Sequence, residues 1–443
     1  MHELSAPPFE PAMADVEKRT IRKLVARVIP IVLLMMFLAH LDRTNVAFAA
    51  KELEREFGFT ATTFGMGVSL FFATYVLLAV PSTLLLRRGS ARIWLSRILI
   101  VWGLVSASNM FVVGENSFYA LRLLLGATEA GFIPFVLAFM ADWLPEQYRA
   151  RVTSIFLLGV PLSGVVGAPI SGLILDHADG KLGLSGWQWM FLSEGIPTIL
   201  CGLVVMRVLT DQPKDAPWLD AEERAWLQGS IDAENAAKLK AYGKQSPFAL
   251  IANPAILLLG LCYAMTGFGT NGIAFFLPQI ISEAGFQSNT VVGLLTAIPL
   301  LAGAISMMIV SQIADRRREY RWIAVIAFTA SGIGFLLASL FLNSPVIALT
   351  GLALASAGIW STLPLLLAMP MQILSGAAVA TGIAILNALG NIGPLFGPVI
   401  TGIARDESGN YALPLAIFSG VIFMAAISMA MNNSYQKSVN HNK

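Results

Sequence analysis

Long apolar stretches follow one another along nearly the whole chain and are separated by short polar segments. A helix of about 20 residues, at a rise of about 1.5 Å per residue, crosses the hydrocarbon core of a bilayer. Hydrophobic residues make up 56% of the 443 residues and charged residues only 13%, against roughly 25% charged in a soluble domain. Membrane β-strands are excluded, because they would read as alternating segments of roughly 10 residues. We therefore expect an all-α membrane protein.

We count about twelve apolar stretches and expect each to be a membrane-spanning helix. In the first half of the chain they cover residues 25–49, 62–86, 93–113, 118–141, 151–175 and 189–209. In the second half they cover residues 254–281, 289–314, 321–342, 345–369, 374–403 and 412–431.

One long polar segment divides these spans into two sets of six. The predicted parts are an N-terminal segment (1–24), an N-terminal six-helix bundle (25–210), a linker (211–252), a C-terminal six-helix bundle (253–431) and a tail (432–443). Arginine clusters after the second and eighth spans indicate that the bundles are pseudo-repeats. We expect the linker to be a solvated connector in which Asp220 and Glu223 begin a helix.

Lysine and arginine are concentrated in alternate loops, all on one side of the predicted membrane. These residues are Lys18, Arg19, Arg22, Lys23, Arg87, Arg88, Arg92, Arg149, Arg151, Arg316, Arg317, Arg318 and Arg321. The opposite loops carry mostly acids, with Lys51, Arg55, Lys181 and Arg405 as exceptions. The positive-inside rule therefore predicts that both termini are cytoplasmic. Residues 1–24 are polar, so no cleavable signal peptide is expected.

Four charged residues stand out within the predicted spans: Asp42 and Arg43 in the first, Arg122 and Glu129 in the fourth. Charges at that depth are costly and usually mark a substrate or ion pathway. Neighbouring helical residues point about 100° apart, so Asp42 and Arg43 must find partners on other helices. We predict contacts of Asp42 with Arg122 and of Glu129 with Arg43. A fixed salt-bridge cluster that only orients helices is the alternative, but the spans of the second half carry no comparable charges in their middle.

These charges suggest a coupling mechanism. A carboxylate in a medium of low dielectric constant takes up a proton readily. When Glu129 is protonated it no longer competes for Arg43, whose planar guanidinium can then hold a substrate carboxylate. We therefore expect a proton and an anion to bind cooperatively.

The sequence around these charges resembles the anion:cation symporter family of the major facilitator superfamily. The stretches that carry the resemblance are Leu41-Asp42-Arg43-Thr44-Asn45, Arg122 with Glu129, Trp143-Leu144-Pro145, Arg149-Ala150-Arg151, Gly186-Trp187-Gln188-Trp189-Met190-Phe191, Phe276-Leu277-Pro278 and Asn387-Ala388-Leu389-Gly390-Asn391. The run Ala314-Asp315-Arg316-Arg317-Arg318 is similar to the loop motif that latches the two bundles in the superfamily. The first copy of this motif, Leu84-Leu85-Leu86-Arg87-Arg88, lacks the Asp.

The resemblance implies roles for individual residues. Asp42 and Glu129 match proton-coupling acids, Arg43 and Arg122 match anion and ion-pair arginines, and Asp315 and Arg316 match gating residues. Expected substrate-binding residues are His40, Arg43, Tyr75, Arg122, Asn271, Trp360, Asn387 and Asn391. For the asparagines, hydrogen bonding to substrate and helix capping or packing both remain open. Relatives carry an aromatic wall where this chain has Leu365, Leu366 and Leu367, and Trp360 either replaces that wall or packs in the core.

The predicted function is proton-coupled import of a small organic carboxylate: a hydroxy or dicarboxylic acid, a sugar acid or an aromatic acid. Importers of tartrate and aromatic carboxylates are most similar. A proton-driven efflux antiporter is the alternative, because the fifth span is rich in Gly and Pro as in such antiporters, although helix packing also explains this. A non-transporting sensor is a third reading. Enzyme activity is not expected, because no nucleophile–base set or metal-ligand cluster is visible.

Residues 267–272 fit the dinucleotide-binding pattern of glycines, but they lie inside a predicted span and not in a βαβ unit. We expect no cofactor, no metal and no nucleic acid. The expected partners are a small organic anion, protons and the lipid bilayer, and the expected location of the monomer is a bacterial inner membrane.

Overall fold

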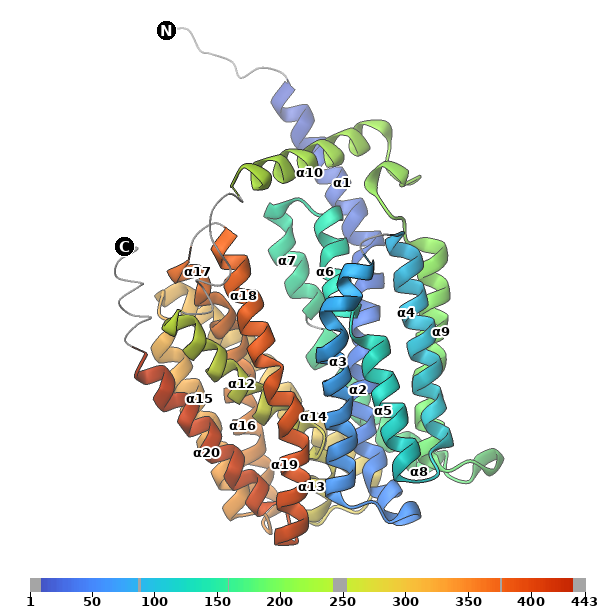
Figure 1. Cartoon of the computed structure of the whole chain (residues 1–443), viewed down its shortest axis with the longest axis vertical. Helices are drawn as coiled ribbons and strands as arrows, with labels where there is room; N and C mark the ends of the chain where they lie inside the picture. Colours follow the sequence, from blue (N-terminus) through green and yellow to red (C-terminus); the bar gives the residue numbers. More distant parts are fainter. Residues whose placement is uncertain (1–8, 87–88, 158, 242–252, 375–376, 433–443) are drawn as a thin grey trace.

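The computed structural model describes residues 9–86, 89–157, 159–241, 253–374 and 377–432, and in these ranges all regular structure is helical. The helices form two bundles that lie side by side, one from each half of the chain (Figure 1). The described residues contain twelve helices, or pairs of helices in line, that are long and apolar enough to cross a membrane. This number and the division into two sets of six confirm the predicted architecture.

The N-terminal bundle follows the amphipathic helix α1 (Phe9–Arg27). It contains α2 (Ile29–Phe57), α3 (Ala61–Leu86), α4 (Ala91–Ser108), η1 (Asn109–Phe111), α5 (Glu115–Glu129), α6 (Phe132–Trp143), α7 (Glu146–Leu157), α8 (Gly159–His177), η2 (Lys181–Gly183) and α9 (Gly186–Val208). The fourth predicted span is thus divided into α5 and α6 directly after Glu129.

The C-terminal bundle repeats this arrangement. It contains α12 (Pro254–Ala274), α13 (Leu277–Glu283), α14 (Asn289–Arg317), α15 (Arg321–Leu340), α16 (Pro345–Ala368), α17 (Pro370–Ile373), α18 (Ala377–Gly390), α19 (Ile392–Ser408) and α20 (Ala412–Ala430). The eleventh predicted span is divided at Asn391 into α18 and α19, and it ends at Ser408, a few residues later than predicted.

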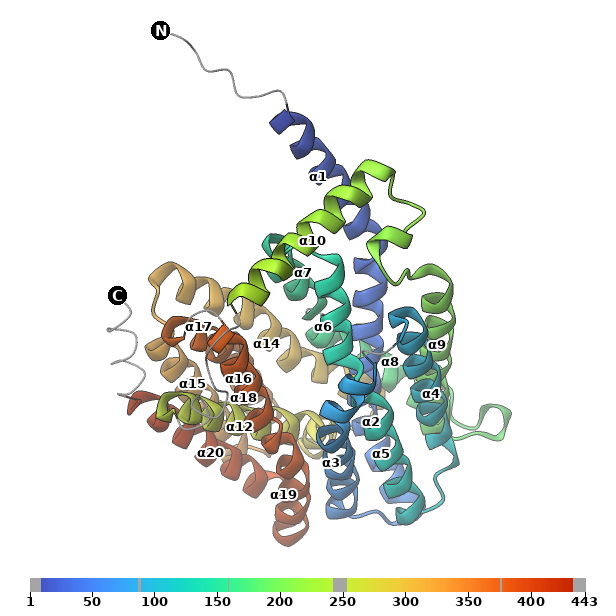
Figure 2. The same ribbon diagram turned by 45° about the horizontal axis from the view of Figure 1, so that its top comes forward.

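The linker packs on the N-terminal bundle and does not form the solvated connector that we expected. After η3 (Pro213–Asp215) it forms α10 (Ala221–Ala241), which lies beside α1 in both views (Figures 1 and 2). Asp220 and Glu223 form the predicted helix start, since each accepts the backbone N–H of the other. The N–H of Glu223 also lowers the pKa of Asp220. Glu223 is fully buried and accepts from Lys23 Nζ at 2.7 Å, which fastens the linker to α1.

The two bundles are joined by hydrogen bonds at one end, which we call the distal end because it is opposite α1 and α10. Asp176, near the end of α8, accepts the backbone N–H of Thr290 at 2.8 Å and of Asn289 at 3.2 Å, at the start of α14. Asp406, near the end of α19, accepts the N–H groups of Ala61 and Thr62, at the start of α3, at 3.1 and 2.8 Å. Two acids at equivalent places in the two bundles thus each satisfy unpaired N–H groups at the start of a helix in the other bundle.

Small residues allow the bundles to approach closely about one helical turn further from the distal end than these contacts. A Cβ at Gly172 on α8 would collide with the carbonyl of Asn289, and one at Gly65 on α3 would collide with the carbonyl of Pro398. The glycines of the fifth span therefore serve helix packing. Together with the two acids, these contacts close the distal end of the interface.

Candidate functional site

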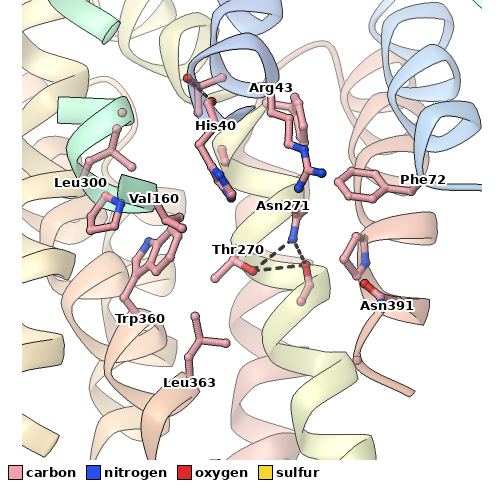
Figure 3. A pocket seen from close by; sticks show the side chains of 18 of the residues that line it. His40, Arg43, Phe72, Val160, Thr270, Asn271, Leu300, Trp360, Leu363 and Asn391 are labelled. Atoms are coloured by element: carbon pink, nitrogen blue, oxygen red, sulfur yellow. Dashed lines mark hydrogen bonds between the residues drawn. The ribbon is translucent and has the colours of Figure 1, made fainter. Parts of the chain in front are cut away.

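A cavity of about 290 Å³ lies between the two bundles and has residues of both in its wall (Figure 3). The N-terminal bundle contributes His40, Arg43, Thr44, Phe72, Val160, Pro161 and Gly164. The C-terminal bundle contributes Tyr263, Gly267, Thr270, Asn271, Ala274, Phe275, Leu300, Trp360, Leu363, Asn387, Gly390, Asn391 and Pro394. Residues 267–272 thus belong to a membrane helix that faces a cavity, and not to a dinucleotide site.

The structure brings Arg43 and Glu129 together, as the sequence predicted. Arg43 on α2 donates to Glu129 Oε2 from Nε at 2.8 Å and from Nη2 at 2.6 Å. Glu129 lies at the end of α5 and is fully buried, whereas the Arg43 side chain is 14% exposed and lines the cavity. Arg43 therefore lies between the cavity and an acid that has no direct access to it.

Aromatic rings hold the Arg43 guanidinium from the side. It lies 4.9 Å from the ring centroid of Tyr75 and 5.4 Å from that of Phe71. Tyr75 was expected to bind substrate, but it is buried and is not among the residues that line the cavity. Its place in the structure is that of a support for Arg43.

The predicted direct contact of Asp42 with Arg122 is not formed. Asp42 accepts from Trp102 Nε1 at 2.9 Å and from the Ser106 hydroxyl, both on α4. Arg122 donates to Asn109 Oδ1 at 2.6 Å. Among the residues that the structure describes, no hydrogen bond or ion pair joins Asp42 to Arg122, although their charges still interact electrostatically. Neither residue lines the cavity.

Neutral polar groups from the C-terminal bundle face Arg43 across the cavity. Asn271, Asn387 and Asn391 line the cavity, as predicted. Asn391 Nδ2 donates to the carbonyl of Asn387 at 2.9 Å, and Asn271 Nδ2 donates to that of Gly267 at 3.0 Å, so both amides are also used within their helices. His40 lines the cavity as well, one turn before Arg43 on α2.

Trp360 lines the cavity and lies near Val160 and Leu363 in Figure 3. It also packs against the core, where its ring leaves no room for a Cβ at Gly303. Leu365 and Leu366, at the place of the relatives' aromatic wall, are fully buried. The single aromatic side chain from α16 therefore reaches the cavity one to two turns away from the expected place.

The predicted gating residues lie far from these contacts. Asp315 and Arg316 are exposed near the end of α14, and Asp315 accepts from the Tyr320 hydroxyl at 2.7 Å. In the described part of the chain no hydrogen bond or ion pair links them to the N-terminal bundle, whereas the distal end is closed.

Sequence reasoning missed a further buried acid in the N-terminal bundle. Glu194 on α9 is 2% exposed and accepts a hydrogen bond from the amide of Asn45, which in turn accepts from the Ser171 hydroxyl. The signal was an acid within the predicted span 189–209.

Comparisons with known proteins agree with the observed fold. The sequence profile described as Major Facilitator Superfamily matches residues 32–398 and 259–442. A protein of Agrobacterium vitis named "Putative tartrate transporter" is 41% identical over 414 residues, which are 94% of this chain and 94% of that protein. The "Quinolone resistance transporter" of Acinetobacter baumannii is 34% identical over 93% of this chain and 94% of its own length. Among solved structures, a partially occluded, inward-open xylose transporter of E. coli has a TM-score of 0.73 at 14% identity, with 93% of this chain and 98% of that chain covered.

Proposed function

Because the chain belongs to the major facilitator superfamily, and is thus a multi-pass membrane transporter and not an enzyme, we propose that it is a proton-coupled symporter that imports a small organic carboxylate. The observation that carries this proposal is the position of Arg43. It lines the cavity and is paired, on its buried side, with Glu129.

This arrangement provides a direct exchange of partners. While Glu129 is ionised, it occupies two N–H groups of the Arg43 fork. Protonation removes the negative charge of Glu129 and weakens both hydrogen bonds, since charge-assisted bonds are roughly twice as strong as neutral ones. Arg43 can then turn its guanidinium to a carboxylate in the cavity. The total charge of the site is the same before and after one proton and one carboxylate bind.

The remaining cavity wall fits a small hydroxy acid. Asn271, Asn387 and Asn391 offer amide groups for hydroxyl or carboxylate oxygens, and Trp360 with Leu363 closes one side. The name of the Agrobacterium relative supports tartrate as the first substrate to test. We further propose that the termini are cytoplasmic in a bacterial inner membrane, that the protein works as a monomer, and that the closed distal end faces the outside.

Uptake into proteoliposomes tests this proposal. The wild-type protein is expected to accumulate labelled tartrate only with an inward proton gradient. Glu129→Gln is expected to lose accumulation but to retain exchange of labelled for unlabelled tartrate, because a fixed neutral side chain still leaves Arg43 free. If Glu129→Gln still concentrates tartrate, the assignment of the coupling proton is wrong.

The alternative function is that of a proton-driven efflux antiporter, and it is supported by the name of the Acinetobacter relative, "Quinolone resistance transporter". The same vesicles separate the two functions. An antiporter would export a drug against its gradient when protons move in the opposite direction, and tartrate would not accumulate under an inward proton gradient.

A further inference from the structure

Glu194 is a third buried carboxyl group in the N-terminal bundle, besides Asp42 and Glu129. The proposed exchange of Glu129 for a substrate carboxylate at Arg43 does not involve it. It is 2% exposed on α9. Its Oε1 accepts from the amide of Asn45, and its Oε2 has no hydrogen-bond partner among the described residues. A buried carboxylate oxygen is rarely left without a donor.

The charges around this group do not balance if all of them are ionised. The cluster contains three acids, Asp42, Glu129 and Glu194, and two arginines, Arg43 and Arg122. Arg43 is occupied by Glu129 through two hydrogen bonds. Asp42 has two donors and interacts electrostatically with Arg122. Glu194 is the acid that remains without a cation of its own.

Among the residues that the structure describes, no other group near Glu194 compensates a negative charge on it. The charged side chains that act on it electrostatically are Asp42 on α2, which repels a negative charge, and Arg122 on α5. Two of the other helices that pack against α9 present neutral groups near this place: Gly103 of α4 lies against Gly195, and the Ser171 hydroxyl of α8 donates to Asn45. An ionised carboxylate with one amide donor in this place is strongly unfavourable, whereas a protonated one needs no counter-ion.

We propose that Glu194 holds a proton in this structure and forms a proton-binding site separate from the Arg43–Glu129 pair. The bound proton makes the five-residue cluster neutral. It also keeps Glu194 from competing with Asp42 for the electrostatic attraction of Arg122. The inference rests on this count of charges and contacts, and it stands whether or not Glu129 couples protons to transport.

Infrared spectroscopy of the purified full-length protein at neutral pH tests the proposal. The wild-type spectrum is expected to contain the carbonyl stretching band of a buried protonated carboxyl group, which shifts slowly in D₂O. Glu194→Gln, which keeps the shape and the Asn45 contact, is expected to lose this band. Glu129→Gln is the matched control and is expected to keep it. A band that is absent from the wild type, or unchanged in Glu194→Gln, would overturn the proposal.

A second measurement does not require the Glu194 variant to fold. Wild-type protein made with glutamate labelled with ¹³C at the side-chain carboxyl is expected to show the band at lower frequency, and labelled aspartate is expected to leave it in place. A shift with labelled aspartate alone would place the proton on an Asp such as Asp42 and refute the proposal. Failure of the transport proposal would look different, because Glu129→Gln would then concentrate tartrate while the infrared band still depended on Glu194.

Discussion

At the level of single residues, Arg43 is the residue that connects the cavity with the buried acid Glu129. Its guanidinium contacts an acid, two aromatic rings and the cavity at once. A lysine ammonium would reach Glu129 as a point charge, but it could not present a planar fork to a substrate carboxylate while stacked beside Tyr75. The residue type at position 43 is thus part of the recognition chemistry that we propose.

We predict that Arg43→Lys weakens tartrate binding by at least about tenfold, equivalent to about 1.4 kcal/mol. The loss comes from one bidentate, charge-assisted contact. Binding is to be measured by calorimetry or by the tartrate-dependent rise in melting temperature. Arg207→Lys, on the exposed end of α9, is the control and should bind like the wild type. Equal binding by Arg43→Lys and the wild type would remove Arg43 from the substrate site.

At the level of whole helices, the distal end is held by two equivalent interactions between the end of one helix and the start of another. Asp176 does this for α14 and Asp406 for α3. A carboxylate at a helix N-terminus contributes typically 0.3–1 kcal/mol and up to about 2 kcal/mol. Both acids must release their partners before the distal end can open.

We predict that Asp176→Asn and Asp406→Asn each shift the protein toward a state open at the distal end, by about 1 kcal/mol or roughly fivefold. Spin labels at Leu182 and Asn410, which are exposed at the distal end of the two bundles, report the change as a longer distance population in double electron–electron resonance. Asp179→Asn is the control, because Asp179 accepts the N–H of Gly186 within the N-terminal bundle. Distances unaffected by all three variants would show that these acids do not control opening.

At the scale of the whole molecule, the proposed mechanism places the proton and the anion at one site, and it therefore requires that their two affinities are linked. If one proton enters with each tartrate, affinity falls as pH rises through the range in which empty protein releases that proton, by up to about tenfold per pH unit. The sign follows because the proton-bound form is the one that frees Arg43. Titrations should use a pH range in which tartrate itself does not change charge.

The slope of affinity with pH is expected to be lost in Glu129→Gln, whose residue 129 cannot release a proton. Calorimetric titrations of the wild type and the variant at several pH values measure it. A wild type whose affinity does not change with pH would contradict linked binding even if transport were observed.

The sequence alone determined the class of protein and the pairing of Arg43 with Glu129. The length of an apolar stretch and the cost of a charge in lipid are local properties. The twelve spans, the two bundles and the positions of Arg43 and Glu129 on different helices could therefore be derived without a fold. Tertiary structure decided what depends on which helix faces meet. In the structure Asp42 accepts hydrogen bonds from Trp102 and Ser106 on α4, and the Tyr75 ring packs against Arg43 outside the cavity. The linker is bound to α1, and Glu194 has no cation as a direct partner. These outcomes could not be derived, because spacing along one helix fixes the direction of a side chain but not the neighbour that it meets.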